Sequence, residues 1–175
     1  KTREATTAHE FLKSFKGILI SDFYAGYDAI QCVQQKCWVH LIRELNDDLW
    51  DSPFDIEFEN LVSMIRALMV PIMESVQKYG LKRRHLFKFM KQVDRFYEKA
   101  IVNKDYKSEL AIKYQRRFIK HKDNLFVFLQ CDGVPWHNNT AERALRHVTT
   151  QQRISLFFHE HVTHDYLRLL GIRQT

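Results

Sequence analysis

Two acidic residues, far apart in the chain, have the strongest potential for chemistry. Asp22 closely follows the apolar run at residues 18–20, and an unbroken run of this kind is typical of a strand buried on both faces of a mainly parallel sheet. Open α/β sheets carry their active groups at the carboxyl ends of strands. Glu142 falls about one turn into a helix that we predict to begin at Asn138 or Asn139, either of which is a good N-cap. Carboxylates held on a strand end and a helix can share divalent metal ions.

The helix predicted around Glu142 also has an apolar face. Ala141, Ala144, Leu145 and Val148 recur at helical spacing and would pack against a core. A simpler interpretation is that Glu142 is an exposed first-turn residue that complements the helix dipole. A role in metal binding therefore requires a second carboxylate, such as Asp22, beside it.

Three motifs occur along the chain in a familiar order. They are SDFYAGY with Asp22, CWVHLIRE with Cys37 and His40, and NNTAERALR with Asn138, Asn139 and Glu142. Along almost the whole chain they resemble the DDE transposases of bacterial insertion sequences, specifically the IS66 group. The resemblance implies an α/β fold of the ribonuclease-H-like type. This fold would be incomplete, with short parallel strands and a large all-helical insertion, and predominantly helical overall.

The resemblance also implies roles for the two carboxylates. It makes Asp22 the second acid and Glu142 the third acid of a triad that uses Mg²⁺ (or Mn²⁺) to cleave DNA and transfer strands in transposition. The family's first acid has no counterpart in this sequence. We therefore expect the chain to be the C-terminal part of the catalytic domain and inactive by itself. It would be either a fragment of a larger transposase or a decayed copy.

Cys37 and His40 have the spacing of half a zinc site, and Cys32 is a possible third ligand. The alternative is that Cys37 packs as a small apolar residue while His40 makes a buried hydrogen bond. By the resemblance, His40 would support the active site without binding metal. Two other groups, seven acids within residues 44–60 and the histidines at 159, 161 and 164, are more simply explained as solvated or helical positions than as metal ligands.

Charge is concentrated in one part of the chain. The 175 residues contain 27 Lys and Arg against 21 Asp and Glu, a net charge of +6, whereas residues 82–122 alone carry 14 basic and four acidic residues. This local excess favours contact with the DNA backbone, without predicted base specificity, over an ordinary solvated helix face. The residues predicted to contact DNA are Lys82, Arg83, Arg84, Lys88, Arg116, Arg117, Lys120, Arg143, Arg146 and Arg153.

The remaining patterns predict the elements that position these residues. We expect a helix over about 6–15, a strand at 17–23, a short helix within 24–31, a strand over 35–39 and a helix over 40–50. Apolar residues from Phe58 to Met69 recur at steps of three and four, up to Pro71, which should bend or end the helix. Gly80 should break the next segment, and a third helix should run from about 105 to 129. These elements suggest a core at 1–50 and 131–175 around a helical insertion at 51–130.

Composition and cysteine count limit the class of protein. No apolar run approaches the length of a membrane span, and three cysteines without a framework fit a reduced cytoplasmic protein, nucleoid-associated if it binds DNA. An unpaired sheet edge would favour a homo-oligomer. Two rival functions stay open: a non-enzymatic, helical nucleic-acid-binding module, and a ribonuclease-H-like nuclease, such as a resolvase, that is not a transposase.

Overall fold

The computed structural model describes Glu10, residues 12–140 and Arg143. It divides into two compact units, Lys1–His137 and Asn138–Thr175, which are described separately. Half of the helix predicted over 6–15 lies outside the described residues, and residues 12–15 form turns and not a helix. Glu142, Arg146, Arg153 and the three C-terminal histidines also lie outside the described residues. The predicted division into core and insertion stays a prediction.

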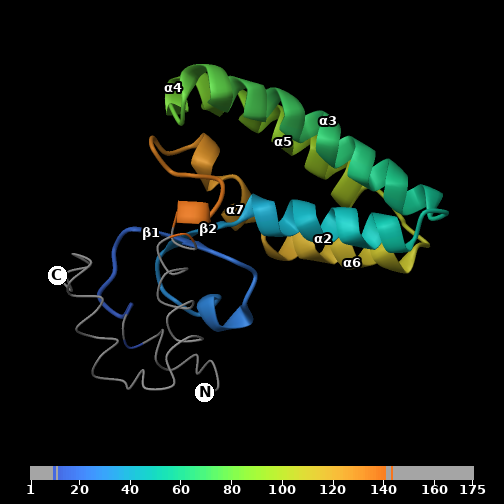
Figure 1. Ribbon diagram of the computed structural model, residues 1–175, viewed down its shortest axis with the longest axis horizontal. Helices are drawn as coiled ribbons and strands as arrows, with labels where there is room; N and C mark the ends of the chain where they lie inside the picture. Colours follow the sequence, from blue (N-terminus) through green and yellow to red (C-terminus); the bar gives the residue numbers. More distant parts are fainter. Residues whose placement is uncertain (1–9, 11, 141–142, 144–175) are drawn as a thin grey trace. The chain divides into compact units, whose positions relative to one another are not determined.

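A short parallel sheet opens the described part of the first unit. Strand β1 (Ile18–Ser21) pairs with β2 (Val33–Lys36), with Ile18 opposite Val33 and Ser21 opposite Lys36. Between them a 3₁₀ turn, η1 (Ala25–Tyr27), returns the chain to the sheet. The parallel pairing and the existence of a strand at Asp22 were predicted correctly, but β1 is shorter than the predicted range of 17–23. The described chain is otherwise predominantly helical (Figure 1).

The prediction of a strand over residues 35–39 is wrong. Strand β2 ends at Lys36, and helix α2 (Trp38–Asp51) begins two residues later, with Cys37 in the extended conformation of an N-cap. The alternation of apolar residues after position 35 belongs to the first turn of this helix. Its inner face, with Leu41 and Leu45 buried, is as predicted.

Pro71 does not end its helix, because α3 (Ile56–Tyr79) continues through it. An interior proline costs about 3 kcal/mol or more, since it removes one backbone hydrogen bond and crowds the preceding turn. Leu68 and Met69 before the proline and Ile72 after it are all buried, so packing on both sides offsets this cost. The helix starts at the Asp55 cap and ends at Gly80, whose φ of 69° favours glycine.

The chain then returns through four short helical segments, α4 (Arg83–Leu86), η2 (Phe87–Phe89), α5 (Met90–Phe96) and the π-helical η3 (Tyr97–Val102). The single helix predicted over 105–129 is instead divided into α6 (Glu109–Lys120), α7 (Lys122–Leu125) and η4 (Val127–Leu129). The interruption falls at His121, which leaves the helical conformation and is itself buried. This bend lets the apolar residues 125–129 enter the core as a compact turn.

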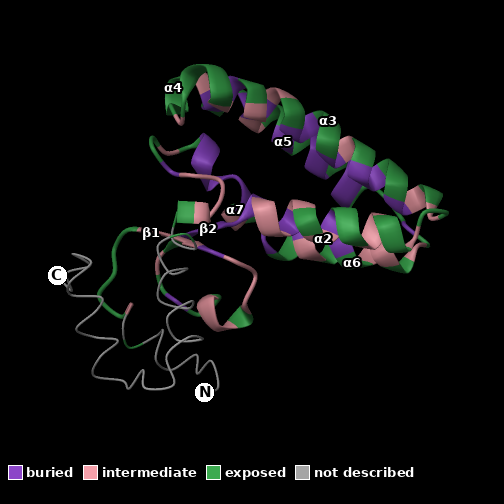
Figure 2. Ribbon diagram, in the orientation of Figure 1, coloured by how far each residue is buried: buried purple, intermediate pink, exposed green. Residues whose placement is uncertain are grey.

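The core of the first unit lies mainly among the helices and the 125–129 turn, and Ile18 of β1 packs against it. In Figure 1, α5 runs beside α3, and α6 runs beside α2. Buried and exposed positions alternate around each long helix (Figure 2), as expected from apolar residues that recur at steps of three and four. Trp38, Phe118 and Phe126 form a cluster of aromatic rings where α2, α6 and the 125–129 turn meet. In the described part of the chain, no helix is both long and apolar enough to cross a membrane.

Candidate active site

Asp22 lies directly after β1, and its carboxylate is partly used by the local turn. Its Oδ1 accepts a hydrogen bond from the backbone N–H of Tyr24 at 3.0 Å, an arrangement that closes a tight turn into η1. The residue is half-buried. No donor among the described residues reaches Oδ2, which leaves this oxygen available as a ligand for a cation.

Consecutive backbone amides of the CWVH motif join the end of β1 to Trp136 within the first unit. The N–H of Cys37 donates to the carbonyl of Ser21 at 2.8 Å, and the N–H of Trp38 donates to the carbonyl of Trp136 at 2.9 Å. Ser21 precedes Asp22, and Trp136 precedes the NNTAER motif. The motif therefore holds the end of β1 next to the chain that leads into the second unit.

The side chains of this motif fix it in the core. Trp38 is fully buried, and its Nε1 donates to the carbonyl of Leu125 at 2.7 Å. Cys37 is also fully buried, as the packing interpretation expects, and His40 lies half-buried on the first turn of α2. Among the described residues, no three His, Cys, Asp or Glu side chains are grouped so that they could hold a metal ion.

A fully buried lysine, which the sequence reasoning missed, lies at the end of β2. The Lys36 ammonium donates to Asp28 Oδ1 at 3.0 Å and to Ser21 Oγ at 3.3 Å. The other carboxylate oxygen of Asp28, Oδ2, accepts a hydrogen bond from the Lys120 ammonium at 2.7 Å. Burial by itself raises the pKa of Asp28, but the hydrogen bonds from the two lysines outweigh burial and hold this pKa below its usual range. The residue type gave no signal, because a lysine within the strand predicted over 35–39 would be expected to face solvent.

Phe23, the residue after Asp22, is held by α6. The Arg117 guanidinium lies 3.8 Å from the centre of its ring, and the His121 ring meets it edge-on at 5.2 Å. Arg117 also makes a bidentate ion pair with Glu44 of the CWVHLIRE motif. Burial lowers the pKa of His121 to about 4, so this ring is neutral at pH 7.

The predicted DNA-contacting residues have different environments. Most are exposed, whereas only about a sixth of the Arg117 side chain is accessible, because it packs against Phe23 and Glu44. Lys120 is exposed but paired with Asp28. Arg83 and Lys88 lie against neighbouring aromatic rings. The exposed members are Lys82, Arg83, Arg84 and Lys88 on and around α4, Arg116 and Lys120 on α6, and Arg143 in the second unit.

Only the start of the helix predicted to carry Glu142 is described. Asn139, Thr140 and Arg143 are helical, and Asn138 directly precedes them, which agrees with the predicted helix start. Glu142 lies outside the described residues, so its distance from Asp22 is untested.

The acidic residues of 44–60 serve mainly to connect helices. Asp48 accepts from Lys113 and Tyr114 of α6. Asp55 caps α3 through the Phe58 N–H, and it also accepts from the Ser108 hydroxyl, which caps α6. These contacts tie the N-terminal ends of α3 and α6 to each other. These two acids are therefore bound by protein groups and are not simply solvated, as had been expected of most of the group.

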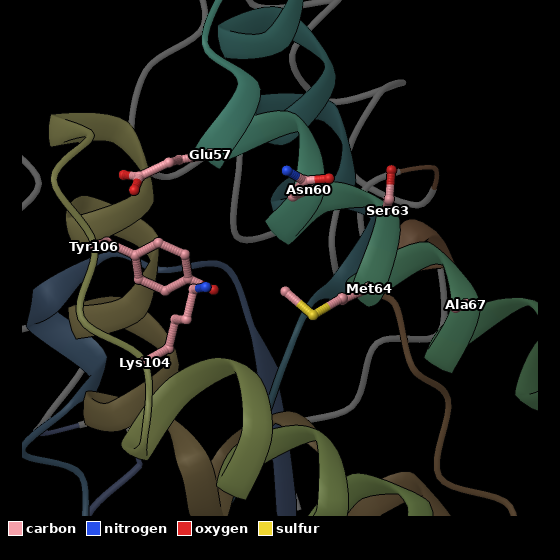
Figure 3. Close-up of a pocket in the computed structure, with 7 residues that line it drawn as sticks. All are labelled: Glu57, Asn60, Ser63, Met64, Ala67, Lys104 and Tyr106. Carbon is pink, nitrogen blue, oxygen red and sulfur yellow. The ribbon is translucent and has the colours of Figure 1, made fainter.

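A surface cavity of about 470 Å³ lies between α3 and the loop before α6 (Figure 3). Two of its polar groups have hydrogen-bond partners: Glu57 accepts from the N–H groups of Lys107 and Ser108, and the Tyr106 hydroxyl donates to the Ala100 carbonyl. None of the residues predicted to be functional lines it. The cavity is lined by Glu57, Asn60, Ser63, Met64, Ala67, Lys104 and Tyr106.

Comparison with known proteins gives one match. Residues 1–164 match the family described as "Transposase IS66 family". No curated protein and no solved structure matches the chain. The match extends over all three motifs, from Asp22 through the CWVH motif to Glu142, and the chain therefore belongs to the IS66 family of transposases.

Proposed function

We propose that this chain forms the later part of a DDE transposase active site, in which Asp22 and Glu142 are two of the metal-binding carboxylates. The observation that carries this proposal is the pair of hydrogen bonds from Cys37 and Trp38 to Ser21 and Trp136. Glu142 follows Trp136 by six residues, so even a fully extended chain could separate them by only about 20 Å. A helical path would be shorter. A ribonuclease-H-like core would bring the two carboxylates to one edge of its sheet.

The local chemistry of Asp22 suits a hard divalent cation. Mg²⁺ and Mn²⁺ prefer carboxylate oxygens, and the Tyr24 N–H fixes one oxygen of Asp22 while leaving the other available. Bound ions would activate the attacking water or 3′-hydroxyl and stabilise the leaving oxygen in an in-line displacement at phosphorus. Asp22 and Glu142 would hold the ions, and Arg143 would neutralise phosphate charge beside them.

The DNA would lie against the exposed basic residues, which supply affinity without reading bases. Substituting Arg84 and Lys88 by Gln should weaken binding to all DNA sequences alike and reduce the salt dependence of the dissociation constant. Arg117→Gln is a different case, because it would also remove the support of Phe23. A homo-oligomer of the parent transposase stays a prediction, which light scattering would test.

The assignment of the two acids is tested in the full-length parent protein. Asp22→Asn and Glu142→Gln should each abolish Mg²⁺-dependent cleavage of the insertion-sequence ends while DNA binding and the melting temperature persist. Asp51→Asn, which neutralises an exposed acid at the end of α2, is the matched control and should cleave normally. Undiminished cleavage by either active-site variant would refute the assignment. DNA binding without any metal-dependent cleavage by the wild type would favour a non-enzymatic binding module.

A further inference from the structure

We propose that Lys36 is a positioning residue for Asp22: its buried ammonium holds both ends of the 21–28 loop, and so fixes where the Asp22 carboxylate points. This role rests on the proposed function of Asp22 as a metal ligand. Nothing in the family match assigns a role to Lys36.

The burial of Lys36 is the first argument. Its side chain is completely inaccessible to solvent, although lysines are almost never fully buried unless they are paired. Desolvating an ammonium costs several kcal/mol, and an apolar residue of similar size often replaces a buried ion pair with no loss of stability. The ion pair with Asp28 is therefore a poor means of stabilising the fold, and a local positional role explains it better.

The hydrogen-bond geometry is the second argument. Lys36 donates to the Ser21 hydroxyl at 3.3 Å, and this hydroxyl donates to the backbone carbonyl of Asp22 at 3.1 Å. At the other end of the loop, Lys36 donates to Asp28 at 3.0 Å. The Asp22 carboxylate in turn accepts from the Tyr24 N–H inside the loop. The Lys36 ammonium thus links the two ends of the loop. Within this network, hydrogen bonds fix the backbone carbonyl of Asp22 and one of its carboxylate oxygens.

The rest of the loop is held independently of Lys36. Cys37 binds the Ser21 carbonyl through its backbone, and Arg117 and His121 hold the Phe23 ring. Removing the ammonium should therefore loosen the carboxylate without unfolding the loop. This separation makes the positional role testable apart from stability.

The test uses the full-length parent protein and three variants. Lys36→Met removes the ammonium and keeps most of the side-chain volume. Ser21→Ala removes only the hydroxyl that relays Lys36 to Asp22. Lys113→Met is the matched control, because it removes a lysine that also binds one aspartate, Asp48, at 2.6 Å. The readouts are the Mg²⁺ concentration that gives half-maximal cleavage and the hydrogen-exchange rate of the Tyr24 amide.

Outer-shell partners of metal ligands typically change metal affinity or activity by about 10–100-fold. Lys36→Met and Ser21→Ala should therefore each raise the Mg²⁺ requirement by about tenfold or more and speed exchange at Tyr24. Because both act through one relay, the double variant should be no worse than Lys36→Met alone. Lys113→Met should keep the wild-type Mg²⁺ requirement. If Lys36→Met fails to fold, the Mg²⁺ requirement and the Tyr24 exchange rate of Ser21→Ala test the positional role instead.

Failure of this inference is distinct from failure of the proposed function. If Asp22→Asn abolishes cleavage while Ser21→Ala and Lys36→Met keep the wild-type Mg²⁺ requirement, Lys36 has no positional role, and the assignment of Asp22 stands. If Asp22→Asn cleaves normally, the proposed function itself is wrong. A loss of stability in Lys36→Met with an unchanged Mg²⁺ requirement also overturns the inference, because it shows a purely structural ion pair.

Discussion

Gln35 offers the sharpest test of how the sheet is joined to the helices. Its side chain is fully buried, and its amide makes three hydrogen bonds. The Nε2 group donates to the carbonyls of Lys36 and Leu125 at 2.7 and 3.0 Å, and Oε1 accepts from the Phe128 N–H at 3.0 Å. One amide thus connects β2 to the turn that follows α7. Gln35→Leu keeps the approximate volume and removes all three bonds.

The expected loss in the free energy of unfolding depends on which hydrogen bonds the partners of Gln35 keep in the variant. The Leu125 carbonyl keeps its bond from Trp38, whereas the described chain gives the Phe128 N–H no other acceptor. Three hydrogen bonds at a net 0.5–1.5 kcal/mol each sum to about 1.5–4.5 kcal/mol, and the gain from an apolar side chain reduces the expected loss to about 1–4 kcal/mol. Urea denaturation of the 175-residue chain, followed by circular dichroism, measures this loss.

Gln92→Leu is the matched control, because Gln92 is exposed on α5. It should change the free energy of unfolding by less than about 0.5 kcal/mol. A loss below about 1 kcal/mol for Gln35→Leu, with an unchanged denaturant slope, would refute the reasoning. It would mean that water or local rearrangement satisfies the Phe128 N–H.

Three further predictions follow from the same contacts. Burial lowers the pKa of His121 to about 4, below the unfolded value of about 6.5. The stability gained from keeping this ring neutral is therefore present above about pH 6.5 and is lost as the pH falls through 4. His121→Asn should flatten the pH dependence of the urea midpoint in that window, and an unchanged slope would contradict the assignment. Hydrogen bonds from the amides of Ser108 and its neighbour hold the pKa of Glu57 below its usual range. Glu57→Ala should speed hydrogen exchange at residues 107–108, and unchanged protection there would show that the carboxylate does not bind them in solution. Trp38→Phe should cost about 1–3 kcal/mol, because it removes a buried hydrogen bond. Trp50 is 86% exposed, so Trp50→Phe should change the free energy of unfolding by less than about 0.5 kcal/mol. Equal losses for the two variants would refute the stabilising role of the Trp38 hydrogen bond.

Much of the helical architecture was predictable because it depends on local periodicity. The stripe from Phe58 to Met69 is buried as its spacing requires, and Gly80 ends α3 because its positive φ suits glycine. The apolar run before Asp22 correctly indicated strand β1, although the predicted range of 17–23 was too long. The three motifs also identified the family, which the family match confirms.

The errors arose where a distant contact outweighed a local preference. Pro71 lies inside α3, because packing on both sides of it keeps the helix intact. Helix α6 ends at His121, because the next residues turn into the core. The roles of Arg117 and Glu44 beside Phe23 join residues from three separate segments, and no spacing in the sequence indicates them.

Strand β2 shows most clearly the difference between what local sequence predicts and what tertiary contacts decide. Its residue types suggest that Val33 is inside and Lys36 is outside, yet Val33 is 55% exposed while Gln35 and Lys36 are fully buried. The sequence by itself determined the helical faces, the presence of the first strand and the order of the family motifs, because these depend on neighbouring residues. Only the tertiary structure decided which side chains of β2 are buried. The groups that bind the buried Gln35 amide and the buried Lys36 ammonium come from Leu125, Phe128 and Asp28. Burial of a polar group is favourable only when its partners are already in place, and the partners of β2 meet it only in the folded chain.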